Sequence, residues 1–434
     1  MATIGDRIRI KRKELGLTQA ELGEKLHVTD RAVSKWESGE GDPSISLLSL
    51  LAETLNVSVD FLLTGKVEET ISLDDMDEEK RALYFIKKDD GVFKKSKWIW
   101  ISNELNKDEY GEFFTSFYCE SSNAECRISC DGDYTLFVNG NMVESNQYGD
   151  FEHYKVFDEI DISKYIKRGE NTFAVLVWHF GEDFQRYKPA RAGVIFEITS
   201  QDKLLLCSDE HILARRSRTY VSGRCKKITN QLGFSFLYDA TKEDGWEYNG
   251  FPDGGFAVAV NKNCSFYLRP DSKLQRNEEK LSRVIKNGGN YYLVDLGEES
   301  VGLPSFELIS STVQKITVFW GEDLSNGHVR GIINDRNFSY EYVAKAGKNK
   351  FTNYMLRLGC RYLEFYSENP SESLYLGIIP QTYPVKKKPF RLKGTVEQKI
   401  YDICVNTLQL SMMEHYVDTP WREQCLYVFD SRNQ

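Results

Sequence analysis

The stretch Thr18–Gly39 gathers residue types that bind nucleic acid. Arg31 and Lys35 lie four positions apart after Thr29, a spacing that places both on one face of a helix. Cationic side chains bind DNA phosphates, and arginine also reads guanine through two parallel hydrogen bonds. The chemistry open to this face is therefore contact with phosphates and bases, and Arg31 is its best single candidate for specificity.

The apolar pattern around this stretch predicts the elements that position it. Over Ile4–Leu63, apolar residues recur at helical spacing, and short interruptions divide them into five short helices. Thr18 and Glu21 form a capping-box pattern that starts one helix, in which Gly23 would let a neighbouring helix approach closely. The next helix should end at Gly39. We expect it to bury Val33 and Trp36 and to expose Asp30, Arg31, Ser34 and Lys35.

The run TQAELGEKLHVTDRAVSKWESGEGDPS resembles the helix-turn-helix of the Xre/Cro family of phage and bacterial repressors, over residues 4–65. The resemblance implies an all-α, five-helix, lambda-repressor-like domain whose helix after Thr29 enters the major groove. It also implies that Gln19 binds a phosphate and that a homodimer binds double-stranded DNA. The predicted DNA contacts are Gln19, Thr29, Asp30, Arg31, Ser34, Lys35, Lys11 and Arg12.

An ordinary solvated helix around a buried tryptophan is the alternative interpretation of this stretch. Asp30 is atypical of a DNA-facing position, because a carboxylate accepts hydrogen bonds from cytosine or orients Arg31 but otherwise repels the phosphates. The combination of capping box, small residue, turn, tryptophan and helix stop favours DNA binding over this alternative.

The rest of the chain has a different pattern. Residues 67–92 are rich in acids and predict a linker. After Trp98, apolar and polar residues alternate and turns are short, which favours antiparallel strands. We expect two β-sandwiches, over residues 93–270 and 271–385. The predicted strands are Trp98–Ile101, Glu112–Tyr118, Cys126–Cys130, Tyr134–Val138, Thr172–Trp178, Gly193–Ile198, Tyr291–Leu296, Lys315–Gly321, Phe338–Ala344 and Cys360–Tyr366.

Residues 386–434 return to helical spacing. Thr395 and Gln398 form a second capping-box pattern, and apolar residues follow at every fourth position from Val396. We predict one long helix that starts at about Val396. The helix that begins here would lack partners on several sides within this sequence.

Four stretches beyond residue 95 resemble the front part of bacterial alpha-L-rhamnosidases of glycoside hydrolase family 78. They are CRISCDGDYTLFVNGNMV, FDEIDISKYIKRGENTFAVLVWHFGED, VDLGEESVGLPSFEL and FRLKGTVEQKIYDICVNTLQLSMMEHYVDTPWREQCLYVFDSRNQ. The resemblance implies jelly-roll-like, carbohydrate-binding sandwiches. It further implies that residues 386–434 begin an (α/α)6 barrel that this sequence leaves incomplete.

By the same resemblance, Glu423 would be the general acid of an inverting glycoside hydrolase. The sugar-binding residues would be Asp418, Arg422 and Asp430. The family's catalytic base lies in later barrel sequence, and Thr419 and Phe429 depart from the family pattern, so we expect no hydrolysis from this chain. The alternative is that Glu423 and Asp430 are solvated carboxylates on a frayed segment.

Four aromatic residues of the first predicted sandwich are candidates for a sugar platform, although burial in a core is the commoner role for such residues. They are Trp178, His179, Trp246 and Tyr248.

Composition limits the remaining function classes. The net charge of -9 argues against nucleic-acid binding through bulk charge, so affinity must come from a local basic patch. The start MATIGDRIRIKRKELG lacks the apolar stretch of a signal peptide, and no long apolar run follows, so we expect a cytoplasmic protein without membrane contact. The nine cysteines are scattered without metal-ligand pairs, so we predict free thiols, no metal and no cofactor.

Together these patterns predict a sequence-specific DNA-binding transcriptional regulator fused to rhamnosidase-like domains that sense a rhamnose-containing sugar. One alternative is an alpha-L-rhamnosidase with a DNA-binding head, present here as an incomplete chain. A third is a product with neither activity.

Overall fold

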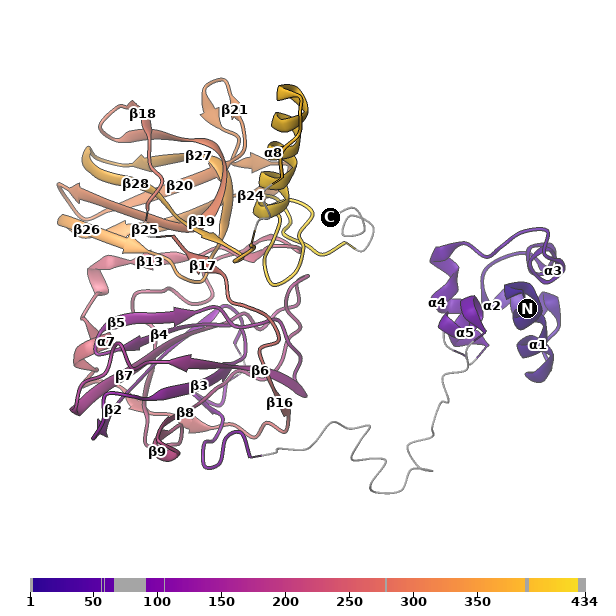
Figure 1. The fold of residues 1–434 in the computed structure, drawn as a ribbon, viewed down its shortest axis with the longest axis horizontal. Coiled ribbons are helices and arrows are strands. Elements are labelled where there is room, and N and C mark those ends of the chain that lie inside the picture. Colours follow the sequence, from indigo (N-terminus) through magenta and orange to yellow (C-terminus); the bar gives the residue numbers. More distant parts are fainter. Residues whose placement is uncertain are drawn as a thin grey trace. The chain divides into compact units, whose positions relative to one another are not determined.

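The computed structural model describes residues 3–55, 57, 59–65, 91–104, 106–277, 279–386 and 390–427. The chain forms two compact units, residues 1–87 and 88–434, and Figure 1 labels most of their elements. Nearly all of the predicted linker, residues 67–92, lies outside the described residues. None of the described helices is long and apolar enough to cross a membrane.

The first unit is helical. Its described helices are α1 (Ile4–Glu14), α2 (Gln19–Lys25), α3 (Asp30–Ser38), α4 (Ile45–Thr54) and α5 (Val59–Thr64). The capping box predicted at the start of α2 is confirmed, because the Thr18 hydroxyl accepts the Glu21 backbone N–H at 3.2 Å and the Glu21 carboxylate accepts the Thr18 backbone N–H at 2.7 Å. Gly39 ends α3 in the left-handed conformation (φ 76°), as predicted.

Close approach of backbones shapes the contact between α2 and α3. A Cβ atom on Gly23 would lie 2.9 Å from the Val28 carbonyl oxygen, so only glycine fits there. The core beneath this contact includes Leu22, Val33 and Trp36, all buried. The predicted helix-turn-helix geometry therefore depends on glycine at position 23, which has no side chain, as well as on apolar packing.

Two sheets that pack face to face begin the second unit. The seven-stranded sheet has the order β15-β1-β8-β3-β6-β16 with β9 beside β8, and the six-stranded sheet has the order β14-β10-β2-β7-β4-β5. Their bounds are β1 (Ile99–Trp100), β2 (Glu109–Cys119), β3 (Glu125–Cys130), β4 (Asp133–Val138), β5 (Asn141–Ser145), β6 (Tyr154–Asp161), β7 (Gly169–His179), β8 (Val194–Ser200), β9 (Lys203–Cys207), β10 (Leu213–Arg216), β14 (Gly255–Phe256), β15 (Val258–Ala259) and β16 (Ser265–Leu268).

The core of this pair lies between the sheets. Phe173 of β7 meets Phe196 of β8 with ring centroids 4.8 Å apart, and Ile128 and Val175 are fully buried in the same cluster. Alternation explains the arrangement, because every second residue of a strand faces the partner sheet.

A nine-stranded sheet follows, with the order β13-β25-β20-β27-β19-β28-β17 and with β18 and β26 beside β19. Its bounds are β13 (Leu237–Asp239), β17 (Gln275–Arg276), β18 (Val284–Asn287), β19 (Tyr291–Ser310), β20 (Gln314–Gly321), β25 (Ser339–Ala344), β26 (Gly347–Thr352), β27 (Leu358–Ser367) and β28 (Ser371–Thr382). The same unit also contains short ribbons and short helices, in addition to α8 (Thr395–Leu410): β11 (Lys227–Thr229), β12 (Gly233–Phe234), the 3-10 helix η2 (Ala240–Lys242), α7 (Trp246–Asn249), β21 (Leu324–Ser325), β22 (His328–Val329), β23 (Ile332–Ile333) and β24 (Arg336–Asn337).

Each strand predicted from the sequence overlaps a strand of the structure. Two pairings differ from the expected antiparallel pattern, because β16 pairs with β6 and β13 pairs with β25 in parallel. Both strands reach their partners through long connections instead of hairpins, which permits parallel pairing. β13 also carries chain from before residue 270 into the nine-stranded sheet.

A row of aromatic rings joins the six-stranded and nine-stranded sheets. Tyr110 of β2 stacks on Tyr220 at 4.9 Å between ring centroids, and Tyr220 meets Phe236 at 6.1 Å. Phe236 then stacks on Tyr340 of β25 at 4.7 Å. The outer face of the six-stranded sheet is therefore part of a second core, shared with the nine-stranded sheet.

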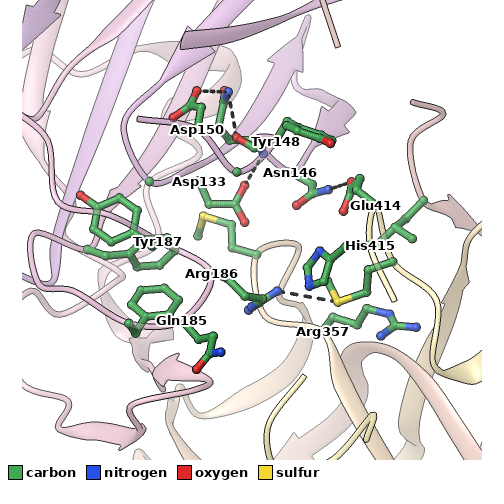
Figure 2. A pocket seen from close by; sticks show the side chains of 18 of the residues that line it. Asp133, Asn146, Tyr148, Asp150, Gln185, Arg186, Tyr187, Arg357, Glu414 and His415 are labelled. Carbon is green, nitrogen blue, oxygen red and sulfur yellow. Dashed lines mark hydrogen bonds between the residues drawn. The ribbon is translucent and has the colours of Figure 1, made fainter. Parts of the chain in front are cut away.

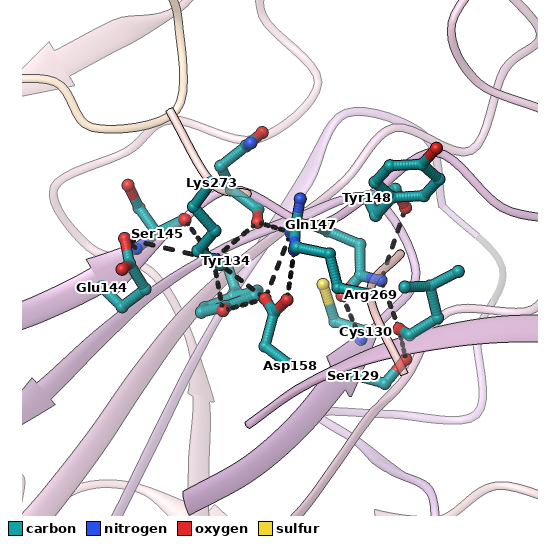
Figure 3. Close-up of polar contacts among 12 residues, drawn as sticks. Ser129, Cys130, Tyr134, Glu144, Ser145, Gln147, Tyr148, Asp158, Arg269 and Lys273 are labelled. Atoms are coloured by element: carbon teal, nitrogen blue, oxygen red, sulfur yellow. Dashed lines mark hydrogen bonds and ion pairs between the residues drawn. The ribbon is translucent and has the colours of Figure 1, made fainter. Parts of the chain in front are cut away.

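A buried polar network joins β4, β6 and the chain after β16 (Figure 3). The Asp158 carboxylate accepts hydrogen bonds from the Tyr134 hydroxyl at 2.5 Å and from the Arg269 guanidinium, and the Lys273 Nζ lies 2.9 Å from it. Burial raises the pKa of Asp158, but the two cations more than offset this effect and leave its pKa lowered. Arg269 also donates to Glu414 at 3.0 Å, which ties the chain after α8 (Thr395–Leu410) to the first two sheets.

Helix α8 begins as predicted but is capped differently. Gly394 is the N-cap and provides no side-chain hydrogen bond, so the capping box expected at Thr395 does not form. Gln398 instead accepts the Leu392 backbone N–H at 2.8 Å. The apolar residues Val396 and Ile400 are exposed, and no described residue of α8 is fully buried.

Candidate functional site

The outer face of α3 is the first candidate site. Val33, Trp36 and Glu37 point into the first unit, which leaves the opposite side of the helix to solvent. The exposed residues there are the predicted ones: Thr29, Asp30, Arg31, Ser34 and Lys35. The Thr29 hydroxyl caps α3 by accepting the Ala32 backbone N–H at 3.2 Å. A cationic, polar face on a capped helix is suited to a polyanion.

Asp30 uses its carboxylate locally. Its Oδ1 atom accepts the backbone N–H of Arg31 at 2.8 Å, at the N-terminal end of α3, where carboxylates stabilise the helix dipole. This hydrogen bond engages the backbone of Arg31 and not its guanidinium. Arg31 is exposed on the outer face of α3.

Gln19, at the first turn of α2, is held by a buried ion pair. Its amide nitrogen donates to the Glu37 carboxylate at 2.8 Å. The same carboxylate accepts two hydrogen bonds from Arg12, at 2.6 and 2.8 Å. Burial raises the pKa of Glu37, but the hydrogen bonds from Arg12 and Gln19 outweigh it and leave its pKa lowered. The pair of Arg12 on α1 and Glu37 on α3 therefore holds the Gln19 side chain in place at the start of α2.

The two remaining predicted DNA contacts lie on α1. Arg12 is buried, with its guanidinium committed to Glu37 and to the Leu17 carbonyl oxygen, so its side chain does not share the exposed face of α3. Lys11 is half-buried and pairs with Glu14 at 2.7 Å. The structure thus brings five predicted residues together on α3 and its N-cap, places Gln19 beside a buried carboxylate, and separates Arg12 from them.

The loop Asp418–Cys425 is the second candidate site. The Asp418 carboxylate accepts the Cys425 backbone N–H at 3.0 Å, which closes the loop. Trp421 is buried against Phe338 with ring centroids 5.0 Å apart, and the Pro420 carbonyl lies so close to Gly359 that a Cβ there would be 2.1 Å from its oxygen. The loop is therefore anchored on the nine-stranded sheet, in contrast to the frayed segment that we considered as an alternative.

Glu423 is half-buried on this loop. Its carboxylate accepts the Tyr427 hydroxyl at 2.8 Å and lies 3.8 Å from an Arg336 nitrogen. Arg422 is exposed. Burial raises the pKa of the nearby Glu322, and the charge of Arg422 only partly offsets this effect. Asp430 lies outside the described residues. The structure thus holds the Glu423 carboxylate in place through Tyr427 and Arg336.

The proposed aromatic sugar platform does not form as one surface. Trp178, His179 and Trp246 are buried, whereas Tyr248 is exposed. The Trp178 indole N–H donates to Asp108 at 3.0 Å, and His179 Nδ1 lies 2.9 Å from Asp131. Trp246 packs against Phe137 and Phe251, with ring centroids 6.1 and 6.2 Å away. These contacts favour the structural interpretation of the three buried residues.

Sequence reasoning missed Glu37 and Gly5. A Cβ on Gly5 would lie 1.9 Å from the Trp36 carbonyl oxygen, so α1 packs directly on the end of α3. The signal for Glu37 was its position directly after Trp36, on the buried side of a helix, where an acid requires a cationic partner.

Comparisons with known proteins agree with this division of the chain. Residues 8–62 match the family model described as a helix-turn-helix. Repressor protein C2 of Salmonella phage P22 is 40% identical over 67 residues, which are 15% of this chain and 31% of that protein. The transcriptional activator BcrR of Enterococcus faecalis is 46% identical over 57 residues, which are 13% of this chain and 27% of that protein. The chain thus spans about a third or less of these two relatives.

The remainder of the chain is similar to solved rhamnosidase structures. The family 78 rhamnosidase of Bacillus sp. GL1 superposes with a TM-score of 0.69 at 17% identity, over 78% of this chain and 60% of that protein. At this identity the likeness establishes the fold of the larger unit and no activity.

Proposed function

We propose, from the premise that an Xre-type helix-turn-helix domain is joined to a rhamnosidase-like fold, that this chain is a sequence-specific transcriptional regulator that binds double-stranded DNA. The observation that carries the proposal is the exposed face of α3, where Arg31, Ser34 and Lys35 project while Val33 and Trp36 hold the helix in the core. The related proteins include one named a repressor and one named an activator, so the proposal leaves the direction of regulation open.

The roles of the individual residues follow from this placement. We assign base contact to Arg31, because it lies in the first turn of α3, which enters the groove first. We assign flanking contacts with bases or phosphates to Thr29, Ser34 and Lys35. Gln19 is assigned a phosphate, and the buried Glu37 sets its orientation. Homodimer binding to two half-sites is part of the proposal, since domains of this type bind paired sites about 34–36 Å apart.

Selection of bound DNA from a random pool, followed by affinity measurements on the selected site, tests this proposal. Arg31→Ala should weaken binding by about 1–3 kcal/mol and relax the preference at one base position. Lys11→Ala is expected to weaken binding to all sequences alike. Arg168→Ala removes an exposed arginine from the second unit and is the matched control, with no expected change.

Two outcomes would refute the assignment. One is that the pool yields no enriched sequence. The other is that Arg31→Ala and Arg168→Ala have equal effects on every site tested, because a base contact cannot be lost without a position-dependent change.

For the second unit we propose two jelly-roll-like β-sandwiches over residues 93–270 and 271–385, preceded by the DNA-binding domain (1–66) and the linker (67–92). Residues 386–434 would be the start of an (α/α)6 barrel. A boundary near 270 is supported by β16, which belongs to the seven-stranded sheet, and β17, which belongs to the nine-stranded sheet, while β13 crosses this boundary to join the nine-stranded sheet. In the regulator, these sandwiches would bind the carbohydrate effector, which the resemblance suggests is a rhamnose-containing sugar.

Hydrolysis of a rhamnoside is the second candidate function. The half-buried Glu423 on an anchored loop supports it, with Asp418, Arg422 and Asp430 as sugar-binding residues. An aryl rhamnoside assay distinguishes the two functions, and we expect no turnover from this chain. Turnover that is lost in Glu423→Gln but kept in Glu368→Gln, which changes an exposed acid, would favour the enzyme.

A further inference from the structure

A cavity of about 460 Å³ lies in the second unit, between loops of the six-stranded sheet, residues of the nine-stranded sheet and the chain after α8. The loops after β5 and β7 line it together with the chain just before β27 and the chain after α8. Figure 2 shows Asp133, Arg186, Arg357 and His415 around this space. The volume is in the range of small-molecule sites. Glu423 does not line the cavity, although Leu426, directly after the loop that carries Glu423, does.

Two arginines in the wall have unused hydrogen-bond donors. Arg357 is 6% exposed, and its Nη1 atom is buried with no hydrogen-bond partner. Its other nitrogens donate only to backbone carbonyl groups, with Nε at 3.2 Å from the Gln381 oxygen. Arg186 is half-buried, its Nε atom has no partner, and its Nη1 atom lies 3.9 Å from the Met413 sulfur.

The acids of the wall are committed elsewhere. Glu414 accepts from Asn146 at 2.6 Å and from Arg269 at 3.0 Å. Asp150 accepts from Lys155 and from the Val156 backbone N–H. The Asp133 Oδ1 atom accepts two backbone N–H groups, at 2.7 and 2.9 Å.

Among the residues that the structure describes, no carboxylate lies within ion-pair distance of Arg186 or Arg357, although the charges of Asp133 and Glu414 act on Arg186 from farther away and partly offset the effect of burial on its pKa. A buried cation without a counter-ion is costly, by several kcal/mol in proteins generally. Burial lowers the pKa of Arg357 to about 9, and the nearby Arg186 adds to the effect. An anion that entered the cavity would satisfy both guanidinium groups and recover this cost.

The rest of the wall restricts the kind of anion. Phe180, Phe184 and Tyr187 give it aromatic surface, and Gln381 and Asn146 add neutral polar groups. Aromatic rings suit the apolar face of a sugar ring, and amides suit its hydroxyl groups. A single carboxylate matches the planar donors that the arginines present.

We propose that this cavity is a binding site for a hexuronate, a six-carbon sugar acid, with Arg357 and Arg186 binding its carboxylate. The site concerns ligand binding alone and does not depend on whether the first unit binds DNA.

Isothermal titration calorimetry on the full chain tests the proposal with D-galacturonate and D-glucuronate as ligands. D-galactose and D-glucose are the neutral controls of the same ring shape, and glucose 6-phosphate tests whether any anionic sugar suffices. We expect at least one uronate to bind about ten- to a hundredfold more tightly than its neutral counterpart, the range of one or two charge-assisted hydrogen bonds.

Variants locate the binding in this cavity. Arg186→Gln and Arg357→Gln should each weaken uronate binding at least about tenfold. The matched control is Arg361→Gln on β27, whose guanidinium bonds Asp295 outside the cavity and should leave the affinity unchanged. Because Arg357 is buried, circular dichroism melting must show that its variant folds, and Arg186→Gln carries the test if it does not.

Three results would overturn the proposal: no heat with either uronate, equal affinity for neutral sugars, or uronate binding that survives Arg186→Gln. Binding of the sugar phosphate without binding of a uronate would likewise reject the carboxylate assignment.

Discussion

Replacement of Glu37 by alanine should destabilise the first unit severely. The Glu37 and Arg12 side chains are only 4% and 9% exposed, and they are joined at 2.6 and 2.8 Å. Alanine would leave the Arg12 guanidinium buried without its counter-ion and would also release Gln19. Removal of one member of a buried pair costs about 3–5 kcal/mol, a large part of the stability of a domain of this size.

Hydrogen–deuterium exchange on the full chain measures this cost locally. A loss of about 3–5 kcal/mol should speed exchange of the most protected amides of α1–α3 by roughly two to four orders of magnitude. Peptides from the second unit should exchange as in the wild type. Glu37→Gln keeps an acceptor of the same shape, so its α1–α3 amides should exchange faster than in the wild type and more slowly than in Glu37→Ala.

Glu40→Ala is the control for this experiment, because it removes a neighbouring but exposed acid. If Glu37→Ala exchanged no faster than Glu40→Ala, the buried pair would contribute nothing to the domain. The role given to Glu37 in orienting Gln19 would then fail as well.

Three further predictions concern packing and pH. Gly23→Ala places a Cβ about 2.9 Å from the Val28 oxygen and should cost roughly 1–3 kcal/mol, measured by the same exchange of α2 and α3 peptides, with Gly41→Ala in open space as the control. Trp421→Ala should cost about 3–5 kcal/mol in urea unfolding of the second unit, and an unchanged midpoint would contradict the anchoring of the Glu423 loop. Burial raises the pKa of Asp133 from 3.8 to about 7, so the folded state holds a proton that the unfolded state releases between these values, and the free energy of unfolding should fall as pH rises through that window. Asp133→Asn should remove this part of the slope between pH 5 and 7, and parallel profiles for the two proteins would refute it.

Local patterns predicted much of this protein. The capping box at Thr18 and the stop at Gly39 depend on residues three or four positions apart, so they could be predicted without any tertiary contact. Strands such as β7 followed from alternation. The second half of β19 did not, because Gly302 and Pro304 interrupt the pattern.

The exposed face of α3 could also be predicted, since the residues that bury the helix, Val33 and Trp36, determine which side remains outside. The capping box expected at Thr395 was wrong because Gln398 is used by Leu392, a contact that the motif does not encode. Such failures occur where a local signal competes with a nearby partner.

The amino-acid sequence alone determined the helix-turn-helix and the β-rich character of the second unit, because both arise from short-range periodicity and backbone preferences. Only the tertiary structure decided the partners of the buried charges. Arg12 meets Glu37 across 25 residues, whereas Arg186 and Arg357 come together from segments far apart in the chain, and no described carboxylate lies within ion-pair distance of either. Pairing of charges depends on which surfaces the fold brings into contact, and no local pattern contains that information.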